Sequence, residues 1–129
     1  MKPKWLEEAL SWKGFVYCCT PYSLYPAGQE AAFIAAAQYA AFMLAEGLCV
    51  YSPIAHSHPL ATYSNLDPLD HRIWMRNDRA MIDAAAGAVV IMMNGWQESR
   101  GIAEEVTAFV AAGKPVVYAS VADLSCLTY

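Results

Sequence analysis

The sequence predicts a three-layer α/β domain, because strand-like and helix-like segments alternate along the whole chain. The strand-like runs are nearly continuous in apolar residues, and "AVVIMM" at 88–93 is the clearest of them. Such runs are typical of strands that are buried on both faces of a sheet. Alternation and apolar strands together predict a mostly parallel sheet of four to five strands with helices on its faces, as in Rossmann and flavodoxin-like folds.

The first half of the chain supplies two strands and one helix. Residues 14–19, "GFVYCC", form a β-rich run that ends at the turn "TPYS". An Ala-rich segment at 27–47 has apolar residues at helical spacing, and Gly47 closes it as a C-terminal cap. The run "LCVYSP" at 48–53 is a second strand that a proline ends, and a polar loop is expected at 54–68.

The second half continues the alternation. A helix is expected at 69–86, a third strand at 88–93, and a helix at 99–112 that ends at Gly113. The run "PVVYASV" at 115–121 is the fourth strand. No internal repeat, low-complexity tract or linker interrupts this order, so the sequence predicts one continuous domain.

The length of 129 residues is that of one domain, 1–129, in which residues 1–13 form an N-terminal extension. Hydrophobic residues make up 57% of the chain and charged residues 16%. Either a well-filled core or an interface between subunits accounts for so apolar a composition. Because the many alanines suit close helix packing, we expect a homodimer or a higher homo-oligomer.

Charge and cysteine usage narrow the partners and the compartment. A net charge of −4 argues against binding a nucleic acid polymer, whereas helix N-termini and hydroxyls can hold the phosphate of one nucleotide. No apolar run reaches the roughly 18 to 20 residues that cross a bilayer, and Glu7 and Glu8 stand where a signal peptide would be uniformly apolar. The four cysteines are Cys18, Cys19, Cys49 and Cys126. They lack metal-ligand spacing, so we expect no metal, and they are expected to be reduced thiols, so we expect a cytoplasmic protein.

Polar residues gather where the predicted strands end. In open parallel sheets, ligands bind beyond the carboxyl ends of the strands. Here those ends are "TPYS", "SPIAHSH" and "NGWQESRG", which are also the loops richest in hydroxyl, imidazole and amide groups. The coincidence predicts a ligand site at this edge of the sheet.

The last long helix carries two adjacent glutamates, and its periodicity separates them. With Ser99 as the N-cap, the apolar stripe of this helix comprises Ile102, Val106, Phe109 and Val110. Relative to Ile102, Glu104 lies about 200° around the helix, facing water, and Glu105 about 300°, on the flank of the stripe. A flank position near a helix start lines a cleft, so Glu105 is the candidate for chemistry. The helix dipole also favours an acidic residue there without any function.

The helix at 69–86 offers a second carboxylate. Its predicted inner face comprises Ile73, Asn77, Ala80, Met81 and Ala84. Arg76, Arg79 and Asp83 fall on the opposite face, and Asp78 lies at the margin. From there Asp78 either reaches the cleft or is an ordinary exposed aspartate.

These features together resemble the nucleoside 2-deoxyribosyltransferase-like superfamily, over roughly residues 14–117, within a small branch whose function is not established. The resemblance rests on Asn77-Asp78 before an apolar strand, on "SRGIAEE" at 99–105, and on "GKPV" at 113–116. The opening "VYCCTPYS" also resembles the first strand and substrate loop of that family.

The resemblance implies two carboxylates with different roles. The Glu four residues after the Gly is the nucleophile of the family and corresponds to Glu105, in agreement with the helical periodicity. The Asp on the preceding helix handles the proton of the nucleobase and corresponds to Asp78. The implied reaction needs no cofactor and parallels that of a retaining glycosidase, with a covalent glycosyl-enzyme that water or another base then captures.

Departures from the family pattern refine this expectation. Ser99 stands where the transferases carry an Asp, as it does in family members that hydrolyse nucleoside 5′-monophosphates and use the serine to hold the phosphate. A hydroxyl at a helix N-terminus accepts a dianion that an Asp would repel, so we favour a nucleotide N-glycosidase over a base-exchanging transferase. Ala86 and Gly87 replace the usual Asp before the third strand. The fifth strand of the family is either absent or comes from the N-terminal segment.

The remaining candidates are expected to bind substrate: Tyr22, Ser23, His56, Trp96, Ser99 and Gly101. Tyr22 and Ser23 lie where the first loop meets substrate in the family, although ordinary turn chemistry also explains them. His56 contacts substrate or only its own loop, and with His58 alone it lacks the further ligands of a metal site. Trp96 stacks on a base or caps the sheet edge. Tyr129 resembles terminal residues that reach a neighbouring subunit's site in some family members.

The sequence therefore predicts cleavage of the N-glycosidic bond of a small nucleotide or nucleoside. Two alternatives stay open. One is a non-catalytic nucleotide-binding module on the same fold. The other is a glycohydrolase that cleaves the nicotinamide–ribose bond of a dinucleotide with the same glutamate.

Overall fold

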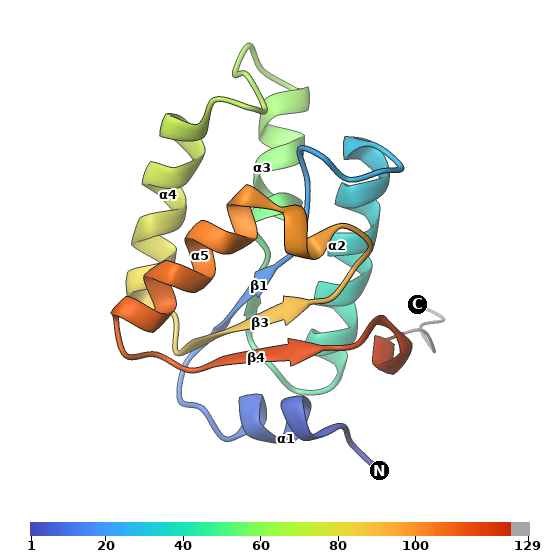
Figure 1. The fold of residues 1–129 in the computed structure, drawn as a ribbon, viewed down its shortest axis with the longest axis vertical. Helices are drawn as coiled ribbons and strands as arrows, with labels where there is room; N and C mark the ends of the chain where they lie inside the picture. The colour runs from blue at the N-terminus through green and yellow to red at the C-terminus, as the bar shows by residue number, and fades with distance from the viewer. Residues whose placement is uncertain (125–129) are drawn as a thin grey trace.

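Four parallel strands in the order β2-β1-β3-β4 form the centre of the structure, a computed structural model that describes residues 1–124 (Figure 1). The strands are β1 Val16–Cys19, β2 Val50–Tyr51, β3 Gly87–Ile91 and β4 Val116–Ala119. All three neighbouring pairs are parallel. The predicted α/β class with a parallel sheet is confirmed, and the described sheet has four strands.

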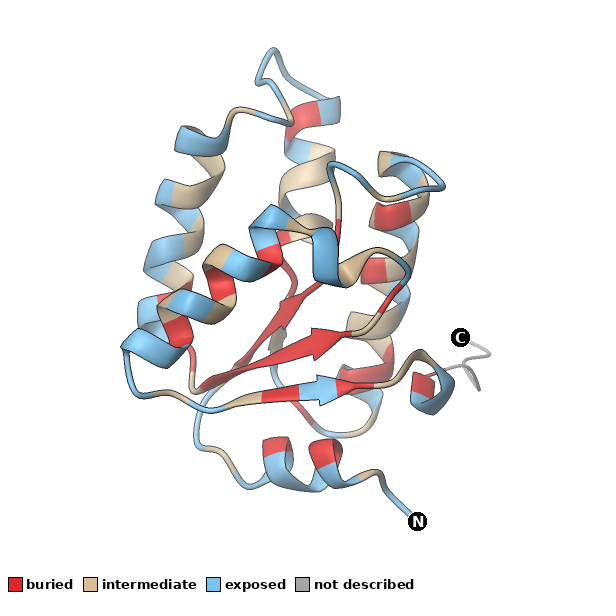
Figure 2. Cartoon of the chain, in the orientation of Figure 1, coloured by how far each residue is buried: buried red, intermediate tan, exposed pale blue. Residues whose placement is uncertain are grey.

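Helices cover both faces of this sheet, and alternate residues of β1 belong to the two resulting cores. Cys18 packs in one core with α1 (Lys4–Leu10) and α2 (Gln29–Ala45), while Tyr17 and Cys19 pack in the other with α4 (His71–Ala84) and α5 (Arg100–Ala111). Figure 2 shows the strands and the inward sides of the helices as buried. Both cysteines are buried free thiols, and burial raises the pKa of Cys18 to about 12.

The predicted loop at 54–68 is wrong for most of its length, because α3 spans Pro53–Thr62. Ser52 caps its start by accepting a hydrogen bond from the Ala55 N–H at 3.2 Å, and Pro53 occupies a first-turn position where no N–H partner is needed. Pro59 lies inside the helix, where a proline removes one backbone hydrogen bond. The proline and the polar residues of this segment are what made it look like a loop.

The N-terminal segment adds a helix and no strand. α1 packs beneath β4 and β3, with Trp5 and Leu6 buried in the core. Trp12, which follows α1, lies against Gly87 at the start of β3, where a Cβ would come within 2.7 Å of the indole ring. This contact is a physical reason for a glycine at a position where the resemblance leads one to expect an acidic side chain.

The chain order places a crevice at one edge of the sheet. From β1 the chain passes to β2 on one side, and later enters β3 on the other side of β1. Loops from neighbouring strands therefore diverge at the carboxyl ends of β1 and β3, which is where ligands bind in such sheets. Two short 3-10 helices, η1 (Trp96–Glu98) and η2 (Val121–Leu124), follow β3 and β4.

Two further findings concern residues 1–124. No helix among them is both long and apolar enough to cross a membrane. Cys126 and Tyr129, to which the sequence drew attention, lie outside the described residues.

Candidate active site

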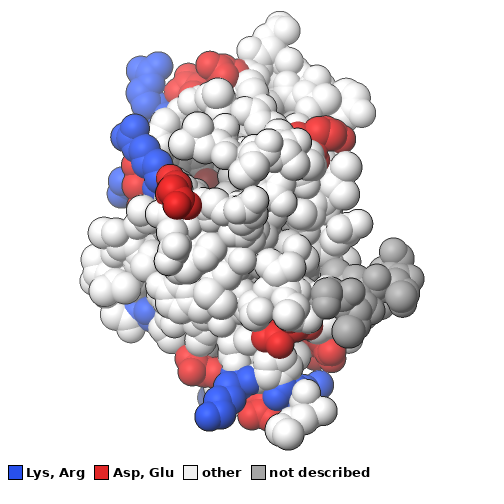
Figure 3. Space-filling view, turned by 45° about the vertical axis from the view of Figure 1, so that its right-hand side comes forward, with Lys and Arg blue, Asp and Glu red and all other residues white. Residues whose placement is uncertain are grey.

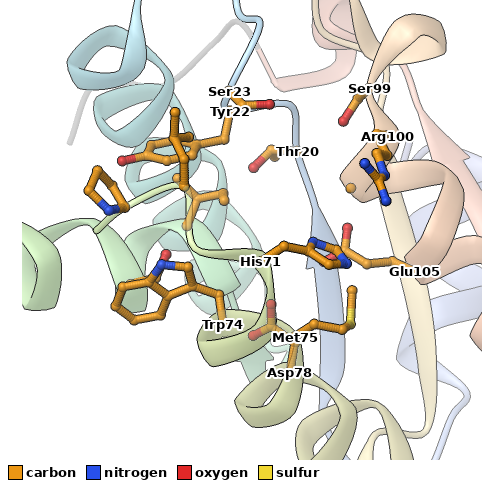
Figure 4. Close-up of a pocket in the computed structure, with 15 residues that line it drawn as sticks. Thr20, Tyr22, Ser23, His71, Trp74, Met75, Asp78, Ser99, Arg100 and Glu105 are labelled. Carbon is orange, nitrogen blue, oxygen red and sulfur yellow. The ribbon is translucent and has the colours of Figure 1, made fainter. Parts of the chain in front are cut away.

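A cavity of about 340 Å³ lies at the carboxyl end of β1, between α3, α4 and the start of α5. It collects residues that are far apart in the sequence: Thr20, Tyr22 and Ser23 after β1, Ile54 and Ser57 of α3, residues 68–78 around the start of α4, and residues 99–105. Figure 4 shows their side chains converging from these separate elements. The sequence placed the site at this edge, and Asp78, Ser99, Gly101 and Glu105 all line the cavity.

Glu105 is an acidic side chain held inside the domain. It is 6% exposed and sits on the inner face of α5 with Ile102 and Phe109. The Tyr17 hydroxyl donates a hydrogen bond to Glu105 Oε2 at 2.5 Å. Burial raises the pKa of Glu105 to about 8, while hydrogen bonds from Tyr17 and Cys19 act in the opposite direction. Glu105 is therefore a carboxyl group that gains or loses its proton near neutral pH.

Its neighbour Glu104 lies on the outer part of the same helix. Its side chain is 32% exposed, with Oε2 at 2.8 Å from His71 Nε2 and Oε1 accepting a bond from Arg100 Nε at 3.0 Å. The buried stripe of α5 is rotated toward Glu105 relative to the predicted one, since Val110, placed in the core from the sequence, is 64% exposed. The rotation buries Glu105 more deeply than a flank position implies.

Asp78 lines the cavity from α4 and is half-buried. The predicted inner face of α4 is wrong in part: Ile73 and Met81 are half-buried as expected, but Asn77, Ala80 and Ala84 are exposed, and Ile82 is buried instead. The inner face thus carries Asp78. Burial raises the pKa of Asp78, and a hydrogen bond from the Tyr51 hydroxyl at 3.2 Å opposes that shift. Tyr51 in turn accepts a bond from the side-chain amide of Asn77 at 2.9 Å.

Tyr17 connects the two carboxyl groups, and sequence reasoning missed it. Its hydroxyl donates its one hydrogen to Glu105, and the same hydroxyl also lowers the pKa of the nearby Asp78. Burial, followed by the charge of Glu105, raises the pKa of Tyr17 far above its usual value, so the hydroxyl keeps its proton. In the sequence, Tyr17 is one apolar-looking residue of a buried strand. Its alternation with Cys18 places it on the α4–α5 face, and that was the available signal.

One end of the cavity is built from hydroxyls and a helix N-terminus. Ser99 is the N-cap of α5, as the sequence predicted, and its Oγ accepts the Ile102 N–H at 3.2 Å. Gly101 has no side chain to cover the first turn of the helix. Thr20 is 4% exposed, and its hydroxyl oxygen has no hydrogen-bond partner within the described chain. A buried unpartnered hydroxyl next to free backbone N–H groups is suited to an anionic oxygen of a ligand.

The opposite end of the cavity is aromatic and apolar. Tyr22 and Trp74 line it together with Ile54, Pro68 and Leu69. The indole N–H of Trp74 donates to the Asp67 carbonyl at 2.8 Å, which fixes the ring (Figure 4). Trp74 escaped sequence reasoning because the inner face of its helix was assigned one position out of register. Flat rings at this end can cover a planar ligand group.

Three predicted binding residues, Ser23, His56 and Trp96, occupy different places relative to the cavity. Ser23 is exposed at the rim and lines the cavity. His56 is exposed on α3 with its ring 5.7 Å from that of Tyr51, outside the lining, and it bears on the site only because its charge contributes to lowering the pKa of Asp78. Trp96 lines a separate hollow beyond β3 and packs on Tyr118, with ring centroids 5.7 Å apart.

Charge and metal-ligand chemistry limit what the site can do. Within residues 1–124, no group of three or more His, Cys, Asp or Glu side chains is arranged to hold a metal ion. On the face seen in Figure 3, charged side chains lie at the upper left, at the top, at the upper right and around the foot, and most of the central area is uncharged. The groups available in the cavity are two carboxyl groups with raised pKa values, the Tyr17 phenol that bonds to Glu105, several hydroxyls, and the side chains of His71 and Arg100, which also line it.

Fold and cavity together define a class: a doubly wound parallel α/β domain with paired carboxyl groups in a ligand-sized cavity at the crevice between β1 and β3. The chain belongs to the family described as a domain of unknown function, DUF1937, which it matches over residues 14–121. That match covers all four strands and the cavity. No curated protein matches the chain.

Proposed function

We propose that this protein cleaves the N-glycosidic bond of a nucleotide or nucleoside, with nucleoside 5′-monophosphates as its preferred substrates. One observation carries the proposal. A buried glutamate with a pKa of about 8 faces a cavity, and the phenol that holds it also contacts the only other carboxyl group of the cavity lining, Asp78. Paired carboxyl groups in different environments are the apparatus of glycoside cleavage.

In the first step, a carboxylate oxygen of Glu105 attacks C1′ of the sugar. The C1′–O bond forms, the bond from C1′ to the base nitrogen breaks, and its electron pair leaves with the base. Asp78 donates its proton to the departing base, so the base leaves neutral and Asp78 becomes a carboxylate. The product on the protein is a glycosyl ester of Glu105.

In the second step, water attacks C1′ and Asp78 takes its proton. The ester bond breaks, Glu105 recovers its electron pair as a carboxylate, and the free sugar or sugar phosphate leaves. A second base in place of water gives exchange instead of hydrolysis. The acceptor enters the space that the departed base leaves, on the face of the sugar opposite Glu105.

The reaction needs one proton on the carboxyl pair. With two protons, Glu105 cannot attack; with none, Asp78 cannot protonate the base. Burial raises both pKa values, and that of Glu105 to about 8, so the pair holds a proton at neutral pH. Tyr17 contacts both groups and stabilises whichever of them is ionised. Positive charge that develops at C1′ favours the form in which Glu105 is the anion.

The preference for a 5′-phosphate rests on the polar end of the cavity. The N-terminus of α5 presents the positive end of its dipole, and the neutral Ser99 adds no repulsion. The hydroxyl of Thr20, buried without a partner, is a donor for a phosphate oxygen. The base then extends toward Tyr22 and Trp74 at the aromatic end, with its sugar near Glu105.

The test is a panel of ribo- and deoxyribonucleosides and their 5′-monophosphates, with free base measured by chromatography. The wild-type protein should release base from at least one 5′-monophosphate. Glu105→Gln, which keeps the shape and the acceptor for Tyr17, should reduce release by about 10³-fold or more. Glu104→Gln is the matched control and should stay within about threefold of wild type.

Three outcomes would contradict the proposal or redirect it. Equal release by the Glu105 and Glu104 variants would contradict a nucleophilic Glu105. Binding of monophosphates, seen as thermal stabilisation, without base release over long incubation would indicate a nucleotide-binding module. Release of nicotinamide from a dinucleotide alone would make the dinucleotide the substrate.

A further inference from the structure

A chain of three polar side chains runs from solvent to the aromatic end of the cavity. The Tyr22 hydroxyl lies 2.7 Å from His58 Nδ1, and His58 Nε2 lies 2.8 Å from Glu30 Oε2. The three residues come from three elements: the loop after β1, the first turn of α2 and the middle of α3. Neither of these two bonds has a part in the two-step reaction described above, and of the three residues only Tyr22 lines the cavity.

The donors and acceptors of the three side chains fix the direction of each hydrogen bond in this chain. A carboxylate only accepts, so the hydrogen of the second bond sits on His58 Nε2. In neutral His58, Nδ1 then accepts, and the Tyr22 O–H is the donor of the first bond. If His58 is doubly protonated, Nδ1 donates and the Tyr22 oxygen accepts, so the bond survives in either state. The contact is therefore a permanent tie between the loop and α3.

Packing restricts His58 further. Its ring is stacked on Phe33 of α2 at a centroid distance of 4.6 Å and an interplanar angle of 22°. The Tyr22 ring meets it edge-on, at 5.7 Å and 79°. The His58 side chain is only 12% exposed, whereas Glu30 is 72% exposed. The imidazole is thus held in one position between α2 and α3, and Tyr22 is hydrogen-bonded to it.

The loop that carries Tyr22 packs on the core through Tyr25, but among the described residues its backbone makes no hydrogen bond to any strand or helix other than the α2 that follows it. Its own bonds are short-range turns, from Tyr25 N–H to the Tyr22 carbonyl at 3.2 Å and from Gly28 N–H to the Tyr25 carbonyl at 2.9 Å. Leu24 within it is exposed. The Tyr22 ring can form a steady wall of the cavity only if its hydroxyl is anchored outside the cavity, and His58 lies there.

We propose that His58 and Glu30 are positioning residues that latch the Tyr22 ring as the wall of the ligand cavity. They touch no reacting atom. The ligand against that wall is the planar base of the substrate, and in this respect the inference rests on the proposed function. A broken latch leaves the carboxyl pair intact but makes the wall mobile, so ligand affinity falls while the chemical step does not.

The first test needs no substrate. Hydrogen exchange of the Tyr25 and Gly28 amides is compared in wild type, Tyr22→Phe, His58→Phe and the double variant. His58→Phe keeps the stack on Phe33, and Tyr22→Phe keeps the ring, so each removes mainly the bond. Both singles should speed exchange several-fold, and the double variant should add nothing, because the two residues act through one bond. Tyr63→Phe, at an exposed tyrosine, should leave exchange unchanged.

The second test measures KM and kcat for a deoxynucleoside 5′-monophosphate. Loss of a half-buried hydrogen bond corresponds to about a fivefold rise in KM in Tyr22→Phe and His58→Phe, with kcat unchanged. Glu30→Gln, which still offers His58 an acceptor, should stay near wild type, while Glu30→Ala should show part of the loss.

The outcomes separate this inference from the proposed function. Unchanged exchange in both single variants, or additive effects in the double variant, overturns the latch even if the protein releases base. A fall in kcat with KM unchanged also overturns it. Faster exchange together with no base release from any nucleotide leaves a latched loop on a protein that is not an N-glycosidase.

Discussion

The inner and outer faces of α5 at its first turns place two glutamates in contrasting surroundings one residue apart. Glu104, outside, is part-exposed and paired with Arg100 one turn earlier on α5 and with His71 on α4. Glu105, inside, is buried against β1 and has no cationic partner among residues 1–124, only the hydroxyl of Tyr17 and the thiol of Cys19. The chemistry of the side chains is the same, and their environments differ in nearly every respect.

The contrast illustrates how the surroundings of a carboxyl group set its reactivity. A carboxylate with basic neighbours in water is a stable anion whose ion pairs contribute at most about 1 kcal/mol. A carboxyl group desolvated beside another carboxyl group carries a pKa near the working pH and a strong tendency to react with positive charge. Burial without a cation is costly for stability, and such costs concentrate at functional sites.

The largest effect that separates the two faces is expected in the pH profile of base release. Because the active pair holds one proton, kcat/KM should fall above the pKa of Glu105, about 8, as that last proton is lost. It should fall also in acid, below the raised pKa of Asp78, as the second proton binds. Rates from pH 5 to 10 should give a bell whose upper limb loses about tenfold per pH unit.

The Asp78→Asn variant tests whether the two carboxyl groups share one proton. Without Asp78, only the ionisation of Glu105 matters, so the residual activity should rise with pH and level off instead of falling. A wild-type profile that is flat between pH 7 and 10 would show that the pair does not share a proton. Glu104→Gln should leave both limbs where they are.

A smaller effect is expected in stability. Between pH 4.5, the ordinary pKa of a glutamate, and about 8, the unfolded chain has lost a proton that folded Glu105 keeps. The unfolded state binds fewer protons there, so the wild-type protein loses stability as pH rises, in total on the order of 3–5 kcal/mol. Glu105→Gln has no proton to lose. Its Tm should match wild type near pH 5 and exceed it by several degrees near pH 9.

The outer glutamate supplies the contrast for that measurement. Glu104→Gln removes partly exposed ion pairs, which should lower Tm slightly at every pH above 5 and never raise it. A Tm gain for Glu105→Gln that is the same at pH 5 and pH 9 would show that its buried carboxyl group does not carry the linkage.

Sequence patterns predicted the elements whose signals are local. The apolar run of β3, the glycine after α2 and the Ser99 cap of α5 each act within a few residues, so each was readable. α3 was missed because Pro59 and its polar neighbours resemble a loop, whereas packing on α2 supports the helix in the folded chain. For the N-terminal segment the sequence predicted an extension without its place on the sheet, since Trp12 lies over Gly87 only once both are in place.

The residues of the candidate site also differ in whether a local sequence signal predicts them. Ser99 and Glu105 follow from a cap and a periodicity on one helix. Tyr17 and the hydroxyl of Thr20 gain their importance from α4 and α5, which begin more than 50 residues later, so nothing beyond the alternation of Tyr17 with Cys18 marks them locally. The bond between Tyr22 and His58 likewise joins the loop after β1 to α3, which only the folded chain brings together.

The central claim is that Glu105 attacks the sugar, and one measurement tests it most directly. Asp78→Asn is mixed with a 5′-monophosphate whose N7-methylated purine leaves without needing a proton, then quenched in acid and digested. Because Asp78 also activates the water, the ester should persist, and fragment-ion mass spectrometry should find the sugar phosphate on Glu105. Base release with no adduct, or an adduct on Glu104, would contradict the account.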